Sequence, residues 1–285
     1  MGRTGTAISC ACARRWKRMP SRPTEAEGWN VGTLEGVDPS PAFRLSIDRV
    51  GRSGAENMAL DQWLLEQADQ TGAAFLRLYR WDPPCLSLGR NEPAARRYDR
   101  TAIERLGLDV VRRPTGGRAV WHEGEVTYAV AAPIAAFGSL RESYRRIHER
   151  LADGLRALGV AAALASAGPS DGPGACFATP AGGEIVVGGR KLVGSAQLRQ
   201  RTALLQHGSI LLEGSQEIIG AISRPPSAVS GGTTLAAVLG RPVSFDEVAE
   251  AVVRAWGDAV TSAPFYRPLP PSTAFFSDPA WTWRR

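Results

Sequence analysis

Cysteine, lysine and long apolar runs are all scarce in this chain of 285 residues. Its four cysteines, Cys10, Cys12, Cys85 and Cys176, are too few and too irregularly spaced to predict a disulfide framework. Because Cys10 and Cys12 have no second Cys or His pair at ligand spacing, we expect no zinc site and no other metal. No apolar run reaches the length of about eighteen residues that predicts a membrane span, and no secretion signal is present. We therefore expect a cytoplasmic protein without a membrane partner.

The net positive charge is concentrated near the N-terminus. The formal net charge is +6, from 34 Lys and Arg against 28 Asp and Glu. Six basic residues precede the first acid, Glu25, so residues 25–285 carry 28 basic groups against 28 acidic ones. The larger part of the chain is therefore neutral, and no nucleic-acid partner is expected.

Composition divides the chain into three predicted parts. Residues 1–38 are rich in Arg, Ser, Thr, Gly and Pro without a sustained apolar period, which is typical of a flexible basic arm. Residues 39–222 alternate strand-like and helix-like apolar segments, which predicts a folded domain. Residues 223–285 combine a Pro/Gly linker with one amphipathic segment, which predicts a small helical C-terminal cap.

Apolar periodicity predicts both strands and helices. Predicted strands cover residues 43–47, 74–81, 85–88, 108–112, 118–121, 125–131, a hairpin of 184–187 and 190–199, and 203–212. Predicted helices cover residues 54–68, 102–106, 140–158 and 245–259. The helix over 140–158 has one apolar stripe, so its arginines and His148 are expected to face water. Residues 166–182 are expected to form a long loop.

Three segments place glycine or small residues beside polar groups, where the backbone can approach a ligand closely. The segments are residues 112–122, 188–197 and 206–211. In the first, Gly116 and Gly117 open a turn whose amides could meet a carbonyl or phosphate oxygen, flanked by Arg113 and Arg118. The same pattern also fits an ordinary glycine turn between strands.

The second segment carries Lys191 and the step 194–196 on one predicted strand, which would neighbour the first segment if the strands pair. Lys17 and Lys191 are the only lysines among the 34 basic residues, which hints that an ammonium is needed at position 191. A chance hairpin lysine fits equally well. In the third segment, His207 and Gly208 interrupt an apolar strand, which indicates either a ligand-binding edge or a satisfied core histidine.

These segments resemble the biotin/lipoate protein ligase superfamily over residues 46–212. The motifs that carry the resemblance are ENMALD at 56–61, WDPP at 81–84, LSLG at 86–89, RRPTGGRAV at 112–120, GRKLVGSAQ at 189–197 and QHGSI at 206–210. They occur in the order found in that superfamily. The resemblance implies an α+β fold with a mixed, mostly antiparallel sheet flanked by helices, and a catalytic domain of this type over residues 39–222.

Within that superfamily the chain is most similar to the cysteine-dependent octanoyltransferases of lipoate biosynthesis. The discriminating feature is Cys176, fifteen residues before Lys191. The resemblance implies that Cys176 takes an octanoyl group from acyl carrier protein, while Lys191 lowers the pKa of its thiol and polarises the thioester carbonyl. A lysine of a lipoyl domain or of a glycine-cleavage carrier protein would then accept the group. A thioester donor needs no further activation, so no cofactor is expected, and only the thiolate attacks.

The resemblance also implies a substrate-binding set built on the motifs. Backbone amides around 116–118 and 194–196 would hold the thioester oxygen. His122 and His207 would position the substrate rather than act as the base. An apolar tunnel for the octanoyl chain is expected from Val120, Val130 and Leu205. The full predicted set is Gly89, Arg113, Thr115, Gly116, Gly117, Arg118, His122, Gly194, Ser195, Ala196, His207 and Gly208.

Three alternatives stay open at the level of sequence. An ATP-dependent lipoate-protein ligase would use Lys191 to contact the acyl carboxylate or the adenylate phosphate, although such ligases generally carry a third glycine where this chain has Arg118. An octanoyl amidotransferase that acts between lipoyl-bearing proteins also uses a loop cysteine. A lipoate- or biotin-binding regulator would keep the fold without turnover, but it would need no nucleophile such as Cys176.

Overall fold

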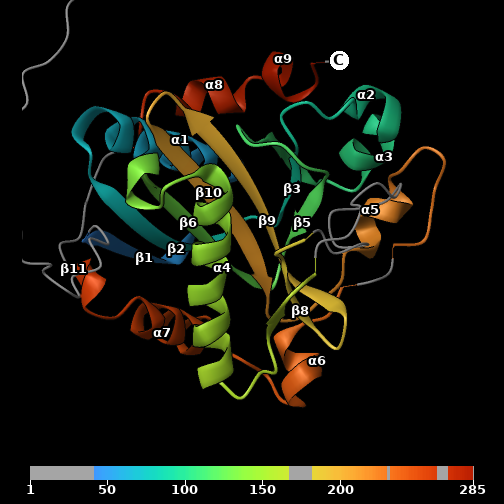
Figure 1. The fold of residues 1–285 in the computed structure, drawn as a ribbon. Coiled ribbons are helices and arrows are strands. Elements are labelled where there is room, and N and C mark those ends of the chain that lie inside the picture. Colours follow the sequence, from blue (N-terminus) through green and yellow to red (C-terminus); the bar gives the residue numbers. More distant parts are fainter. Residues whose placement is uncertain (1–41, 167–181, 230–231, 262–268, 285) are drawn as a thin grey trace, which may run out of the picture. The chain divides into compact units, whose positions relative to one another are not determined.

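The computed structural model describes residues 42–166, 182–229, 232–261 and 269–284, all within the compact unit Pro39–Arg285. The strands of these residues form two sheets (Figure 1). The large sheet has the order β11-β1-β2-β6-β10-β9-β8-β7, and the small sheet has the order β4-β3-β5. The predicted fold class is confirmed, because most strand pairs are antiparallel and helices flank the sheet.

The large sheet contains the strands on which most of the candidate site is built. Its bounds are β11 (Val260–Thr261), β1 (Phe43–Arg52), β2 (Ala74–Trp81), β6 (Glu125–Pro133), β10 (Ala203–Leu211), β9 (Arg190–Gln200), β8 (Ile185–Val187) and β7 (Ala163–Leu164). Strands β1 and β2 pair in parallel, and helix α1 (Gly54–Thr71) supplies the crossover that parallel neighbours need. From β2 to β7 every described pair is antiparallel.

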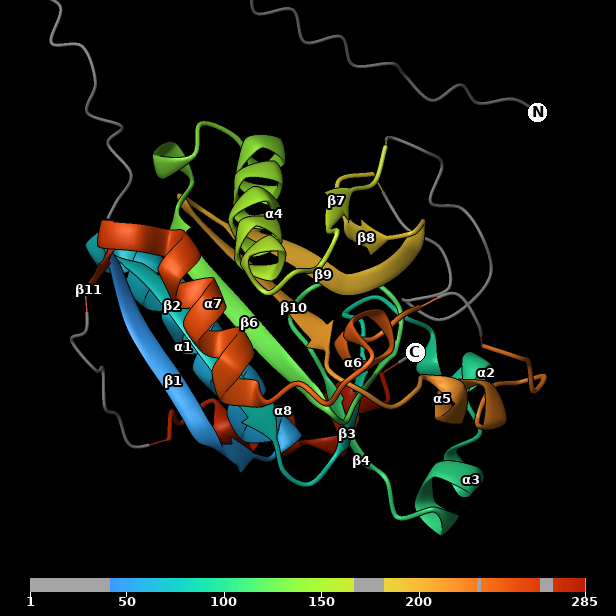
Figure 2. The same ribbon diagram turned by 90° about the horizontal axis from the view of Figure 1, so that it is seen from below.

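Strand β2 packs on both faces of the large sheet because its side chains alternate between them. Leu76 and Leu78 join the core cluster beneath helices α4 (Leu140–Ala157) and α7 (Phe245–Trp256), whereas Phe75 and Tyr79 join the cluster on the α1 side. Figure 2 shows α4 and α7 on the same face of the sheet. The sheet is therefore buried on both faces, and β2 reads as an almost continuous apolar run.

Helix α1 begins with a capping box and buries polar residues. The Ser53 side chain accepts a hydrogen bond from the Glu56 backbone, and the Glu56 side chain accepts from the Ser53 N–H. The helix ends at Gly72, which adopts φ 73°. Its buried face includes Asn57 and Asp61, both fully buried. This polar part of the buried face lies against the candidate site.

The small sheet packs beside several short helices. Its strands are β3 (Cys85–Leu88), β4 (Asp109–Arg112) and β5 (Val120–His122), and the helices are α2 (Ala94–Arg97), α3 (Arg100–Arg105), α5 (Glu217–Ala221), α8 (Thr273–Ser277) and α9 (Pro279–Thr282). Helix α6 (Leu235–Leu239) packs instead in the core of the large sheet. The buried guanidinium of Arg112 donates to the carbonyl oxygens of Thr282 at 2.9 Å and Arg284 at 3.2 Å. The C-terminal segment is thereby attached to the small sheet.

Most predicted elements agree with the structure, although several predicted bounds differ. The strand predicted over 43–47 extends to Arg52. The strand predicted over 118–121 begins only at Val120, because the Arg118 carbonyl accepts a hydrogen bond from Arg113 instead of entering the ladder. In the helix predicted over 245–259, the α-helix ends at Trp256, and residues 257–259 form a 3-10 helix that begins where Gly257 adopts φ 57°. Most of the predicted loop 166–182 lies outside the described residues, as does the predicted arm 1–38.

The three-part division of the chain stays a prediction. Helix α7 contributes to the same core cluster as α4, and β11 pairs with β1 at Phe43 and Arg44. Residues after 222 thus extend the core and the sheet of the central part. None of the described helices is long and apolar enough to cross a membrane.

Candidate active site

A pocket of about 350 Å³, part of it open to solvent, lies where the large and small sheets meet. Seven predicted residues line it: Arg113, His122, Gly194, Ser195, Ala196, His207 and Gly208. The lining also includes six residues outside the predicted set, of which Met58, Trp81, Ser87 and Ser209 lie within the quoted motifs and Tyr79 and Thr127 do not. Of the predicted tunnel residues, Val120 lines the pocket. Val130 and Leu205 do not line it, because each is buried in one of the two hydrophobic cores that cover the faces of the large sheet.

The two glycine-rich segments meet at this pocket without pairing as strands. Strand β9 pairs with β10 and β8, whereas residues 112–122 contribute to the small sheet. The two segments are therefore not paired strands of one sheet. Both segments still contribute to the pocket, because β9 and the small sheet each present residues to it.

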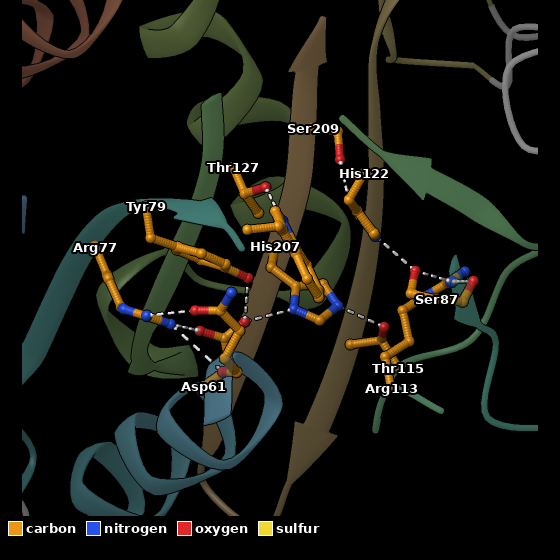
Figure 3. Close-up of polar contacts among 12 residues, drawn as sticks. Asp61, Arg77, Tyr79, Ser87, Arg113, Thr115, His122, Thr127, His207 and Ser209 are labelled. Atoms are coloured by element: carbon orange, nitrogen blue, oxygen red, sulfur yellow. Dashed lines mark hydrogen bonds and ion pairs between the residues drawn. The ribbon is translucent and has the colours of Figure 1, made fainter. Parts of the chain in front are cut away.

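A buried chain of polar contacts runs along one side of the pocket (Figure 3). Asp61 Oδ2 lies 2.8 Å from His207 Nδ1, and His207 Nε2 lies 2.7 Å from Thr115 Oγ1. Arg77 donates to Asp61 Oδ1 at 3.0 Å, and the Tyr79 hydroxyl donates to Asp61 Oδ2 at 2.8 Å. The Asp61 carboxylate accepts a hydrogen bond from Nδ1–H, and in the tautomer that this contact selects, Nε2 accepts from the Thr115 hydroxyl.

The charges of Asp61 and Arg77, at one end of these polar contacts, compensate each other inside the protein. Burial alone lowers the pKa of the Arg77 guanidinium, but the charges of Asp61 and Asp48 outweigh that effect and leave the pKa raised. Burial, together with the Asp61 charge, raises the pKa of Tyr79 well above its ordinary value. The Tyr79 hydroxyl therefore keeps its proton and remains a donor.

A second chain of the same type lies on the small-sheet side of the pocket (Figure 3). Glu125 Oε1 lies 2.8 Å from His122 Nδ1, and His122 Nε2 lies 2.7 Å from Ser87 Oγ. The Ser87 oxygen also accepts a hydrogen bond from Arg113 at 3.0 Å, so its own proton is directed to His122. The His122 ring stacks on Trp81 at a centroid distance of 3.9 Å. Both predicted histidines are therefore held in fixed orientations.

Several predicted binding residues support the pocket without lining it. A Cβ atom at Gly89 would lie 1.8 Å from the carbonyl oxygen of Gly117, so glycine is required there for close backbone contact. The Arg113 guanidinium donates to the carbonyls of Gly116 at 2.8 Å and Arg118 at 2.6 Å. Thr115 contacts His207. The hydrogen bonds from Arg113 thus stabilise the turn over 115–118.

Gly208 meets a similar steric limit between β10 and β9. A Cβ atom there would lie 2.3 Å from the Gly194 carbonyl oxygen and 2.6 Å from Ser195 Oγ. This close approach explains why a glycine interrupts the apolar β10 strand.

Lys191 is buried and forms an ion pair that the sequence motifs did not reveal. Its Nζ donates to Glu184 Oε1 at 2.7 Å, and the two side chains are 2% and 4% exposed. The signal that could have identified Glu184 is a single acid at the start of the otherwise apolar strand Ile185–Val187. Cys176 lies outside the described residues, so its predicted pairing with Lys191 stays a prediction.

His148 is a buried residue of α4, and the prediction that it faces water is wrong. It is 0% exposed, and its Nε2 lies 2.8 Å from Ser195 Oγ in the pocket wall. The amphipathic pattern predicts the wrong exposure for His148, because on the buried face of α4 this polar side chain contacts polar groups of β9. Burial, aided by the charge of Lys191, lowers the pKa of His148 from 6.5 to about 3.

This low pKa predicts a loss of stability in acid. Between pH 6.5 and about 3, His148 stays neutral when folded but takes up a proton when unfolded, so lowering the pH favours unfolding. Chemical unfolding measured across this range should show a steeper loss of stability in the wild-type protein than in the variant His148→Gln, which cannot titrate. Equal slopes for the two proteins would contradict the buried neutral histidine.

The chain matches the family model described as the lipoyl protein ligase A/B catalytic domain over residues 53–257. The chain belongs to this family. Curated relatives include octanoyltransferase LipM of Kyrpidia tusciae, which is 42% identical over 73% of this chain and 84% of the relative. Octanoyltransferase LipM of Moorella thermoacetica is 41% identical over 76% of this chain and 86% of the relative. The superfamily resemblance is confirmed, and the family match contains both Cys176 and Lys191.

Solved structures of the family share the fold. A lipoate-protein ligase A bound with ATP superposes with a TM-score of 0.70 at 21% identity, covering 85% of this chain and 98% of that chain. The bipartite lipoate protein ligase of Thermoplasma acidophilum superposes with a TM-score of 0.65 at 19% identity, covering 85% of this chain and 96% of that one. At this identity the similarity shows the fold alone.

Proposed function

We propose that this protein transfers an octanoyl group from acyl carrier protein, through a thioester on Cys176, to a lysine of a lipoyl-accepting protein. The observation that carries the proposal is the similarity to relatives named octanoyltransferases, which extends over most of the chain. These relatives make it an acyltransferase of lipoate biosynthesis. The donor, the covalent intermediate and the acceptor are the proposed parts.

The described residues support this chemistry in two ways. Lys191 supplies a buried ammonium whose position is restrained by Glu184, and such a group can stabilise a thiolate and a developing oxyanion. Cys85 is the one free cysteine that the described part of the chain contains, and burial raises the pKa of its thiol well above the ordinary value. Cys85 is therefore unsuited to be the nucleophile, which favours Cys176.

The proposed reaction consists of two balanced transfers. The Cys176 thiolate attacks the thioester carbonyl of octanoyl-acyl carrier protein, the new C–S bond forms, the C–S bond to the carrier breaks, and the carrier leaves as a thiolate that takes up the proton Cys176 had lost. The acceptor amine then attacks the octanoyl-Cys176 carbonyl, an amide forms, and Cys176 is released as the thiol with the proton that the amine loses. Because both donors are thioesters, ATP is not consumed.

The test is intact mass spectrometry after mixing the protein with octanoyl-acyl carrier protein in the absence of ATP. We expect an adduct of the mass of one octanoyl group that maps to Cys176 and disappears when a lipoyl domain is added. Acceptor modification that requires ATP and free octanoic acid, with no adduct on the protein, would contradict the proposal and indicate a ligase.

A further inference from the structure

A third buried polar network reaches the pocket from the α4 side of the sheet. It links His148 on α4, Tyr128 on β6, Ser195 on β9 and Gln206 on β10. Helix α4 lies over these strands (Figures 1 and 2). The network ends at Ser195, the one member of these four that lines the pocket.

The donors in this network follow one another in a single direction. Gln197 Nε2 donates to Gln206 Oε1 at 3.0 Å, and Gln206 Nε2 donates to the Tyr128 hydroxyl oxygen at 3.0 Å. Burial raises the pKa of Tyr128, so its hydroxyl stays protonated. Because Tyr128 already accepts from Gln206, its own proton is directed to the nearer acceptor, Ser195 Oγ, at 2.7 Å.

The proton of Ser195 is then directed to His148. Ser195 Oγ lies 2.8 Å from His148 Nε2, which is a bare acceptor when the ring is neutral and protonated at Nδ1. The backbone of Gly183 lies beside the ring and favours a proton on it, although Nδ1 makes no full hydrogen bond within the described residues. The Gly183 contact favours a ring protonated at Nδ1, which leaves Nε2 bare.

Ser195 therefore has no proton left to offer the pocket. Its oxygen accepts from Tyr128 and donates to His148, and its remaining lone pair can accept a hydrogen bond from a ligand. Among the groups that react, the acyl chain and the thioester carbonyl contain no N–H or O–H donor. The attacking amine of the acceptor lysine does contain one.

We propose that His148 is a positioning residue that holds the Ser195 hydroxyl as an acceptor for the amine that attacks the octanoyl thioester. This inference rests on the proposed function and deepens it, because it assigns the second half-reaction to a distinct group of the pocket. Ser195 orients the amine lone pair toward the carbonyl carbon by holding one N–H. The charge of Lys191 reaches His148 and disfavours an imidazolium beside it. His148 therefore acts through Ser195 and does not carry the proton itself.

The experiment measures the two half-reactions separately by rapid-quench mass spectrometry of the full chain. Acylation is followed with octanoyl-acyl carrier protein, and aminolysis is followed by adding a lipoyl domain to the isolated octanoyl-enzyme. His148→Leu and Ser195→Ala should each slow aminolysis by about tenfold or more relative to acylation, the effect of losing one hydrogen bond to an ionisable group. His148→Gln should restore most of the rate, because its amide oxygen can accept the Ser195 proton.

Two controls separate positioning from structural damage. The neighbouring buried residue Ile147, changed to Val, alters α4 packing without contacting Ser195 and should leave the ratio of the two rates unchanged. The double variant His148→Leu/Ser195→Ala should be no slower than Ser195→Ala alone, since both changes remove one interaction. Equal slowing of both half-reactions, additive losses, or wild-type aminolysis in His148→Leu would overturn the proposal.

Nitrogen NMR of the wild-type protein tests the same arrangement without activity. We expect the His148 Nε2 resonance of an unprotonated ring nitrogen, which Ser195→Ala shifts. A protonated Nε2 would overturn the inference even if the enzyme is an octanoyltransferase. Failure of wild-type protein to acquire the octanoyl group would instead overturn the proposed function, and with it the amine as the partner of Ser195.

Discussion

Replacing Cys176 with alanine is expected to abolish octanoyl transfer, with a loss on the order of 10³-fold or more in kcat/KM. Alanine cannot form the thioester, so the two-step route has no intermediate. Cys85 cannot substitute for it, because its thiol is buried, its pKa is raised and it does not line the pocket. The measurement is octanoyl attachment to a lipoyl domain, quantified by mass, with thermal unfolding measured in parallel.

The matched control is Cys85→Ala, which removes a thiol from the core and leaves the pocket lining intact. It should keep the activity of the wild-type protein. The covalent scheme would be refuted by near wild-type transfer in Cys176→Ala, whatever the behaviour of the control.

The second large effect is on stability, at Asp61. Changing Asp61 to alanine removes a fully buried carboxylate that accepts from Arg77, Tyr79 and His207. The Arg77 guanidinium, 1% exposed, then keeps Asp48 as its charged partner and loses the other. Breaking a buried ion pair from one side costs about 3–5 kcal/mol, and we expect a decrease of that order in the free energy of unfolding. Urea unfolding followed by circular dichroism measures it.

An exposed pair provides the comparison for Asp61. Arg100 and Glu104 lie 2.8 Å apart with side chains 56% and 61% exposed, so Glu104→Ala should cost less than about 1 kcal/mol. Similar costs for Asp61→Ala and Glu104→Ala would show that Asp61 does not anchor the buried network. A surviving folded fraction of Asp61→Ala should also transfer octanoyl groups slowly, because His207 loses the group that fixes its tautomer.

The strands and the contents of the pocket could be predicted from the sequence to a large extent. Strands β2 and β3 coincide with the segments predicted over 74–81 and 85–88. Pro83-Pro84 separates the two apolar segments, and Gly89 ends the second one. The substrate-binding set implied by the family resemblance includes seven of the pocket residues. Close backbone contact explains why glycine is needed at Gly89 and Gly208. A steric requirement for glycine at such positions is visible in the sequence as a conspicuous glycine within an apolar strand or at its end.

The partners of buried charges could not be predicted in this way. Three buried acids contact buried basic side chains: Glu184 contacts Lys191, Asp61 contacts His207, and Glu125 contacts His122. Asp61 reaches its partner only through the strand register and the packing of α1. His148 illustrates the same limit. Its place in an amphipathic helix suggested exposure, whereas the polar patch on β9 that receives it belongs to a segment more than forty residues away. Tertiary contacts of this kind override periodicity.

The attachment of the C-terminal segment to Arg112 has a consequence for biosynthesis. The carbonyl that accepts from Arg112 Nε lies 170 residues further along the chain, at Thr282. On the ribosome, at roughly 5–20 residues per second, the small sheet therefore waits on the order of ten seconds or more for this partner. During that interval the guanidinium has only local acceptors, including the Gly89 carbonyl, so we expect the small sheet to gain its C-terminal support only once Thr282 has been synthesised.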